Sequence, residues 1–249
     1  MVKYLHLWEN KAQHEAYIGG GDYVEPYVGY DLENVYYNKI DPFNGHAYVE
    51  IGGLKWATMN VGAESETDYG LYFQWGDTQG YTSSQVGSGE GQKYFDWTDY
   101  KYGNGTSSPD ATGMTKYNAT DGLTTLEAVD DAAVANWGGS WRMPTTSEIQ
   151  ALGNAVTAVW TTDYNGSGIN GLLCTDKTDS TKTLFFPAAG GAFNGIMRSV
   201  GGGVIVWSSS LNSSRLSSAW SLYFDDFEDA QWNSTGGRFN GLSVRPVVG

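Results

Sequence analysis

The sequence predicts an α+β fold in which β-structure dominates. Short apolar segments separated by turn residues occur at 48–60, 183–190, 203–207 and 220–225, and the chain has 34 glycines to form the turns between them. Only two stretches, 125–135 and 146–152, combine helix formers with a helix-start signal. We find no internal repeat of useful period, which excludes solenoids and propellers.

Residues 1–45 differ in composition from the rest of the chain. They are rich in tyrosine, contain Gly19–Gly21 and end in the turn signal Asp41–Gly45. We expect an N-terminal arm or small β element over 1–45, which could attach the protein or make it a homo-oligomer. A strand pair that completes the main domain fits the same pattern.

The main domain is expected over 46–249. It begins with two short strands around the Gly52-Gly53 turn within Tyr48–Asn60. Residues 80–125 show no helical period and predict a long irregular insertion. The aromatic side chains expected to hold it are Tyr94, Phe95, Trp97, Tyr100 and Tyr102.

Two short helices and two core strands follow in the chain. Thr125–Ala135 consists of strong helix formers, and Thr146–Leu152 follows Pro144 with a polar start that can cap a helix. Thr183–Gly190 and Gly203–Trp207 are apolar and predict strands of the core.

The C-terminal region combines a serine-rich run with an alternating strand. The run Trp207–Trp220 predicts a display surface. In the strand that follows, Trp220, Leu222 and Phe224 alternate with Ser221, Tyr223 and Asp225, which predicts one buried and one exposed face. The polar and aromatic mixture beyond it is typical of adaptable recognition surfaces.

Composition excludes several classes of function. The net charge of −14, without a basic cluster, disfavours nucleic acid and anionic membranes as partners. No stretch is long and apolar enough to span a membrane, and the first ten residues lack the apolar core of a secretory signal. The single cysteine, Cys174, lies among apolar residues and predicts a buried structural thiol.

Several blocks together resemble a known family. They are Leu54–Gly62, Gly70–Gly76, Gly139–Thr145, Leu184–Gly190, Trp207–Ser210 and Ser243–Pro246. In this order they resemble the C-type lectin fold in its formylglycine-generating-enzyme-like branch. More narrowly, they are similar to the variable proteins of diversity-generating retroelements, a family that includes phage tropism determinants. The resemblance covers residues 46–249.

The resemblance implies a variable region at about 207–246. In that family an adenine-specific process rewrites selected codons, often those of asparagine, into a set that excludes tryptophan, glutamine, glutamate, lysine and methionine. Trp207, Trp220, Gln231 and Trp232 are therefore expected as scaffold, although Trp232 can also serve as an aromatic anchor. The expected ligand-binding residues are Asn212, Ser213, Ser214, Arg215, Ser217, Ser218, Ser221, Tyr223, Asp225, Asp226, Phe227, Asp229, Trp232, Asn233, Ser234, Arg238, Phe239 and Asn240. Leu216 is also permitted to vary.

We expect no enzymatic activity, no cofactor and no required metal. The oxidation chemistry of the related branch uses cysteines, and this chain has only Cys174. No Gly-x-Ser-x-Gly motif occurs, and the three histidines all lie within the first 46 residues. The acidic group Asp225, Asp226, Glu228 and Asp229 is interpreted as a solvated turn. Arg142 and Arg245 are expected to hold backbone carbonyls or an acid inside the fold.

The sequence therefore predicts a binding protein without catalytic activity. The expected partner is a host-cell surface receptor or another protein, with a glycan as the open alternative. A phage tail is the expected setting, with cytoplasmic synthesis before assembly, if the chain has no leader. A bacterial surface adhesin and a fixed structural virion subunit are the alternatives.

Overall fold

The computed structural model describes residues 44–105, 113–227 and 230–249. Contacts divide the chain into residues 1–39 and 40–249, and only the second unit falls within the described residues. The expected N-terminal arm, apart from residues 44–45, therefore lies outside them.

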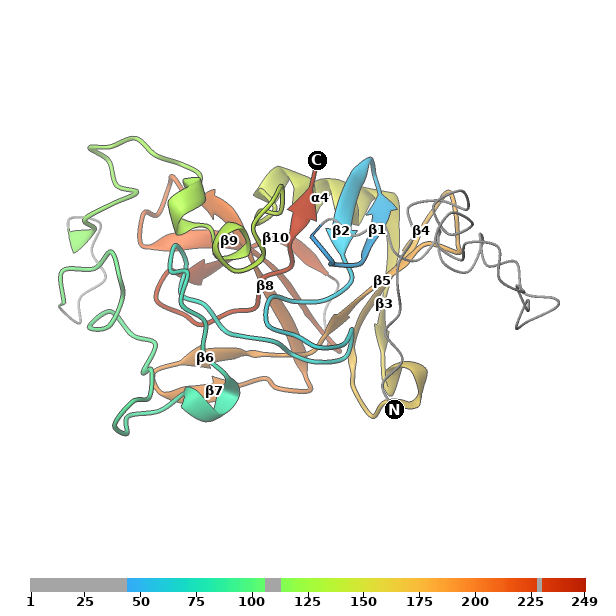
Figure 1. The fold of residues 1–249 in the computed structure, drawn as a ribbon, viewed down its shortest axis with the longest axis horizontal. Coiled ribbons are helices and arrows are strands. Elements are labelled where there is room, and N and C mark those ends of the chain that lie inside the picture. The colour runs from blue at the N-terminus through green and yellow to red at the C-terminus, as the bar shows by residue number, and fades with distance from the viewer. Residues whose placement is uncertain (1–43, 106–112, 228–229) are drawn as a thin grey trace, which may run out of the picture. The chain divides into compact units, whose positions relative to one another are not determined.

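Three small antiparallel sheets and one hairpin form the β-structure of the described residues (Figure 1). The sheet ordered β1-β2-β11 contains Tyr48–Ile51, Leu54–Ala57 and Val247–Val248. The sheet ordered β3-β4-β5 contains Val156–Thr161, Gly171–Asp176 and Thr183–Pro187. The sheet ordered β10-β9-β8 contains Gln231–Gly237, Ser218–Asp225 and Gly203–Leu211. The hairpin pairs β6, Gly191–Phe193, with β7, Ile196–Arg198.

The helices are short, as predicted, but one begins later than expected. In α4, Thr146–Ala155, the Thr145 hydroxyl accepts from the Glu148 backbone N–H, and the Glu148 carboxylate accepts from the Thr145 backbone N–H. The expected helix at 125–135 is replaced by the 3₁₀ turn η3, Ala128–Asp130, and by α3, Ala132–Trp137. The start of the expected helix pairs with β8 instead, since Thr125 forms a bridge with Ser210 and the Leu126 N–H donates to the Ser209 carbonyl. The structure also has the 3₁₀ turns η1, Ser83–Gln85, and η4, Tyr164–Gly166.

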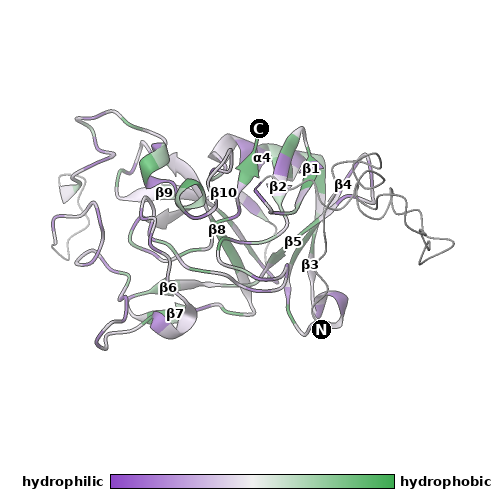
Figure 2. Cartoon of the chain, in the orientation of Figure 1, coloured by the Kyte–Doolittle hydropathy of each residue, from purple (hydrophilic) through white to green (hydrophobic). Residues whose placement is uncertain are grey.

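The β8–β9–β10 sheet has two different faces. Val206, Leu222 and Phe224 pack on one face in a core that also includes Ile149 of α4 and Phe186 of β5. Figure 2 shows β5 and the first part of β8 as apolar, whereas the described loops over residues 80–105 and 113–127 are more hydrophilic. The protein is thus α+β with β-structure dominant, as predicted, and one face of this sheet is fixed by α4.

The insertion over 80–125 is irregular in its described part, as predicted. Phe95, Trp97 and Tyr100 are buried and anchor it. Trp97 packs edge-on against Tyr100 with their ring centroids 5.5 Å apart. Tyr102 is half-buried, and Tyr94 is 39% exposed although its ring lies against Gly195, so both contribute less to holding the insertion.

Candidate functional site on the β8–β9–β10 sheet

The alternation predicted for β9 is confirmed at Leu222 and Phe224 but not along the whole strand, because Ser221, expected on the exposed face, is only 2% exposed. Leu222 and Phe224 are buried in the core on the α4 side. Ser221 and Tyr223 lie on the opposite side and line a pocket of about 310 Å³. Trp220, expected to be buried, is only half-buried.

The pocket gathers side chains from five segments of the chain. Its lining consists of Phe193, Ile205, Ser221, Tyr223, Gln231, Ser234, Thr235, Gly236, Asn240 and Leu242. Four of the expected ligand-binding residues are therefore brought together, namely Ser221, Tyr223, Ser234 and Asn240. None of the ten lining residues carries a formal charge at neutral pH.

The end of β9 adds an acidic and aromatic edge. The Tyr223 hydroxyl donates to Asp225 Oδ2 at 2.6 Å, and Asp225 Oδ1 accepts the Phe227 N–H at 3.0 Å. Asp226 is exposed, and Phe227 is 88% exposed. Asp229 and Glu228 lie outside the described residues. Phe227 is the most exposed large hydrophobic side chain among the described residues.

The serine-rich run 207–220 is only partly a display surface. Ser213, Ser214 and Arg215 are exposed in a turn that Asn212 stabilises by accepting the N–H groups of Ser214 and Arg215. Ser217 and Ser218, also expected to bind ligand, are buried.

The expectation of display was wrong for Ser208 and Ser209 as well. Both are buried because β8 continues through them to Leu211. Their hydroxyls donate to the carbonyls of Trp220 and Pro144. Hydrogen bonding to the backbone is what lets these polar side chains enter the interior.

Arg238 is not a surface residue, and its assignment to the ligand-binding set is corrected. Its side chain is 0% exposed. The guanidinium donates to the Tyr100 hydroxyl at 2.8 Å and to three backbone carbonyls, those of Lys116, Tyr117 and Leu216, at 2.9–3.0 Å. It also lies over the rings of Trp75, Tyr100 and Tyr117. Arg238 therefore attaches the end of β10 to the insertion.

The other expected residues of β10 and its exit take different positions. Asn233 is exposed. Trp232 packs with the α4-side core, and a Cβ placed on Gly153 would lie 2.5 Å from its indole ring. Phe239 is half-buried against Trp97, with ring centroids 4.9 Å apart. Trp232 and Phe239 are thus packing residues, which limits their value as anchors for a ligand.

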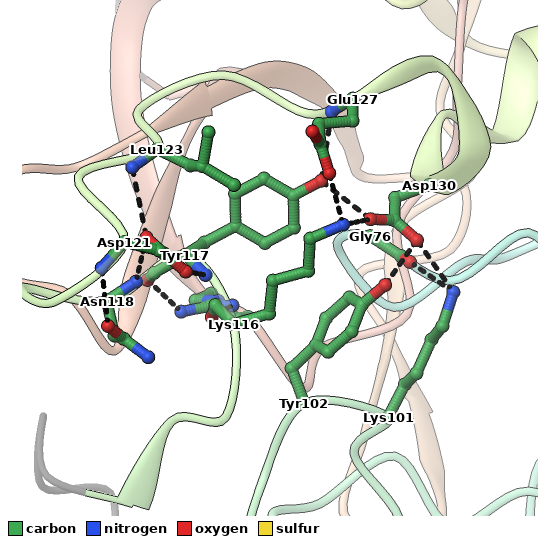
Figure 3. A network of polar contacts seen from close by, with 11 residues as sticks. Gly76, Lys101, Tyr102, Lys116, Tyr117, Asn118, Asp121, Leu123, Glu127 and Asp130 are labelled. Carbon is green, nitrogen blue, oxygen red and sulfur yellow. Dashed lines mark hydrogen bonds and ion pairs between the residues drawn. The ribbon is translucent and has the colours of Figure 1, made fainter.

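A polar network joins residues of the insertion to Asp130 of η3 (Figure 3). This network was not predicted from the sequence. The buried Asp130 carboxylate accepts from Lys116 Nζ at 2.6 Å, Tyr117 OH at 2.7 Å, Lys101 Nζ at 3.0 Å and Tyr102 OH. Although burial acts to raise the pKa of Asp130, these donors hold that pKa well below its usual range. Burial and the hydrogen bond to Asp130 raise the pKa of Tyr117 to about 12.

This network is structural rather than a binding site. Asp130 already accepts four hydrogen bonds, so its carboxylate has no acceptor position left for a ligand. The backbone carbonyls of Lys116 and Tyr117 accept from Arg238, which connects the network to β10. The contributing residues are spread over about thirty positions without a period, so no local sequence signal could have revealed it.

Arg142 and Arg245 are structural, as predicted. Arg142 makes two hydrogen bonds to the Glu148 carboxylate, at 2.8 and 2.6 Å. Arg245 is buried and donates to Asn60 and to the carbonyls of Ala57 and Phe185. Burial lowers the pKa of Arg245 to about 9.

The remaining reactive side chains make packing contacts. Cys174 is buried in β4, and burial raises the pKa of its thiol. His46 stacks on Trp137 with ring centroids 3.6 Å apart, and burial lowers its pKa; His6 and His14 lie outside the described residues. Over 44–105, 113–227 and 230–249, no group of three or more His, Cys, Asp or Glu side chains could hold a metal ion. In the same ranges no helix is long and apolar enough to cross a membrane.

Comparison with known proteins gives no relative for this chain. No family model, no curated protein and no solved structure matches it.

Proposed function

We propose that this chain is a ligand-binding protein without catalytic activity. Its scaffold would be a C-type lectin fold of the kind found in variable proteins of diversity-generating retroelements. Changeable side chains on the β8–β9–β10 sheet and the 212–216 turn would contact a protein on a host-cell surface. A phage tail is the proposed setting, and a bacterial surface adhesin is the alternative.

One observation carries the proposal. Ser221, Tyr223, Ser234 and Asn240 converge on one pocket, whereas the opposite face of the same sheet is fixed against α4. Tyr223 and Ser234, which are half-buried at the pocket, can change while Leu222 and Phe224 keep the backbone in place. The mixture of tyrosine, serine and asparagine is also typical of binding surfaces that accept many partners.

The exposed aromatic ring at the edge provides the test. Phe227→Ala removes a contact but no packing, because the ring is 88% exposed. We expect Phe227→Ala, labelled for detection, to bind host cells at least about tenfold more weakly than the labelled wild type. A loss of this size is typical of an aromatic hot spot. Val129→Ala is the matched control, since Val129 is 72% exposed on η3, outside the pocket.

The melting temperatures of both variants should stay close to that of the wild type. Unchanged cell binding by Phe227→Ala, together with defective particle assembly, would instead identify a fixed structural subunit.

A further inference from the structure

We infer that the pocket on the β8–β9–β10 sheet takes an uncharged aromatic side chain of a protein partner, tyrosine or tryptophan, that donates a hydrogen bond to Asn240. This inference rests on the proposed function and names the chemical group that the surface would recognise. It is supported by the composition of the pocket, by the amide of Asn240 and by the position of Tyr223.

The lining selects against charged groups. Phe193, Ile205 and Leu242 supply apolar surface, and the polar members carry only hydroxyl or amide groups. An ion entering this pocket would lose water without gaining an opposite charge, which is costly. A volume of about 310 Å³ is at the lower end of ligand pockets and suits a single ring rather than an extended segment.

Asn240 provides a hydrogen-bond acceptor that the described residues do not use. The residue lines the pocket and is 8% exposed, yet its buried Oδ1 has no hydrogen-bond partner. A buried polar atom without a partner destabilises the fold, so a ligand that supplies an N–H or O–H group gains from pairing with it. Pairing requires the amide to turn so that Oδ1 meets the donor of the ligand in the pocket.

Tyr223 favours an aromatic ligand over a sugar. Its hydroxyl donates to Asp225, so the phenol ring is held at the pocket wall. Aromatic rings attract each other in offset or edge-on arrangements beyond the effect of area alone. A pyranose ring carries hydroxyl groups around its whole edge, and those that face Phe193, Ile205 and Leu242 would lack partners. The carboxylates of Asp225 and Asp226 beside the pocket disfavour anionic ligands.

The test uses small probes and two-dimensional amide NMR of the full chain. The probes are p-cresol, 3-methylindole, toluene, 4-hydroxybenzoate and methyl glucoside, each titrated to about 20 mM or to its solubility limit, a range that detects weak binding. We expect p-cresol and 3-methylindole to saturate and to shift the amide signals of Ser221, Ser234 and Asn240. Toluene, which lacks the donor, should bind at least roughly threefold more weakly, and the anion should not bind.

Three variants test the site and its hydrogen-bond acceptor. Ser234→Trp should fill the pocket and abolish probe binding, while Ser213→Trp, the same change on the exposed 212–216 turn, should leave it intact. Asn240→Leu should remove the difference between p-cresol and toluene. Thermal unfolding of each variant shows whether it has folded.

Three results would overturn the inference: saturable binding of methyl glucoside alone, equal affinity for toluene and p-cresol, or no binding by any probe. These results are independent of the host-cell assay. If Phe227→Ala leaves cell binding unchanged while the probes bind as expected, the proposed function fails and the chemistry of the pocket stands. If cell binding depends on Phe227 but no probe binds, only the inferred anchor is wrong.

Discussion

Replacing Arg238 with leucine should destabilise this protein far more than the same change at Arg215. Both arginines lie in the region expected to vary, but Arg238 is buried, whereas Arg215 is exposed on the 212–216 turn. The leucine leaves the carbonyls of Lys116, Tyr117 and Leu216 without their donor. At about 1 kcal/mol for each carbonyl, the loss is about 3 kcal/mol.

The stacked guanidinium adds to this effect. Arg238 lies over the rings of Trp75 and Tyr100, with its central carbon 4.9 and 5.3 Å from their centroids. Losing this cation–π contact costs about 1 kcal/mol more. For a chain of this size, a total of about 4 kcal/mol lowers the melting temperature by roughly 8–16 °C.

Differential scanning calorimetry of the two variants at neutral pH measures the effect. Arg215→Leu should remain within about 2 °C of the wild type, as expected of a surface substitution. If Arg238→Leu melts no lower than Arg215→Leu, Arg238 does not hold the insertion to β10, and its reassignment from ligand-binding residue to scaffold is wrong.

Three further predictions concern the support of the site and its acid stability. Gly153→Ala should lower the melting temperature despite better helix propensity, because the new Cβ meets Trp232; Asn154→Ala on the same helix should not. Adding Trp232→Ala should remove the penalty at Gly153. Because the folded-state pKa of Asp130 lies below its unfolded value of about 3.9, its stabilisation is present at neutral pH and is lost as the pH falls below about 4. Asp130→Asn should therefore lower the urea-unfolding free energy at pH 7 and flatten its decline between about pH 5 and 2, and an unchanged profile would contradict this. Lys116→Met should lower the pH 7 value too, since it removes the donor 2.6 Å from Asp130.

Local patterns predicted the parts of this fold that depend on neighbouring residues. Turn chemistry predicted the Gly52-Gly53 hairpin, and the capping residues predicted the start of α4. The period of two predicted the buried face of β9. The structural roles of Arg142 and Arg245 were also predictable, because Arg142 lies between the Gly138-Gly139 pair and the start of α4, and Arg245 is next to Pro246.

The composition of the C-terminal region did not reveal which polar residues are buried. Ser208 and Ser209 enter the interior because backbone carbonyls accept their hydroxyl protons, and this pairing has no local sequence signature. Arg238 bonds residues about 120 positions earlier in the chain. The pocket likewise depends on Phe193 and Leu242, which other elements bring to the sheet. These features required the tertiary structure.

Sequencing the DNA that flanks this gene tests the central claim most directly. The proposed function predicts a near-copy of the segment encoding 207–246, differing only where the copy has adenine, beside a reverse transcriptase gene. The differences should fall on codons of surface and pocket residues such as Ser213, Tyr223, Phe227 and Ser234, and should spare Arg238. The absence of such a copy, or differences concentrated at core codons such as those of Leu222 and Phe224, would contradict a diversified binding surface.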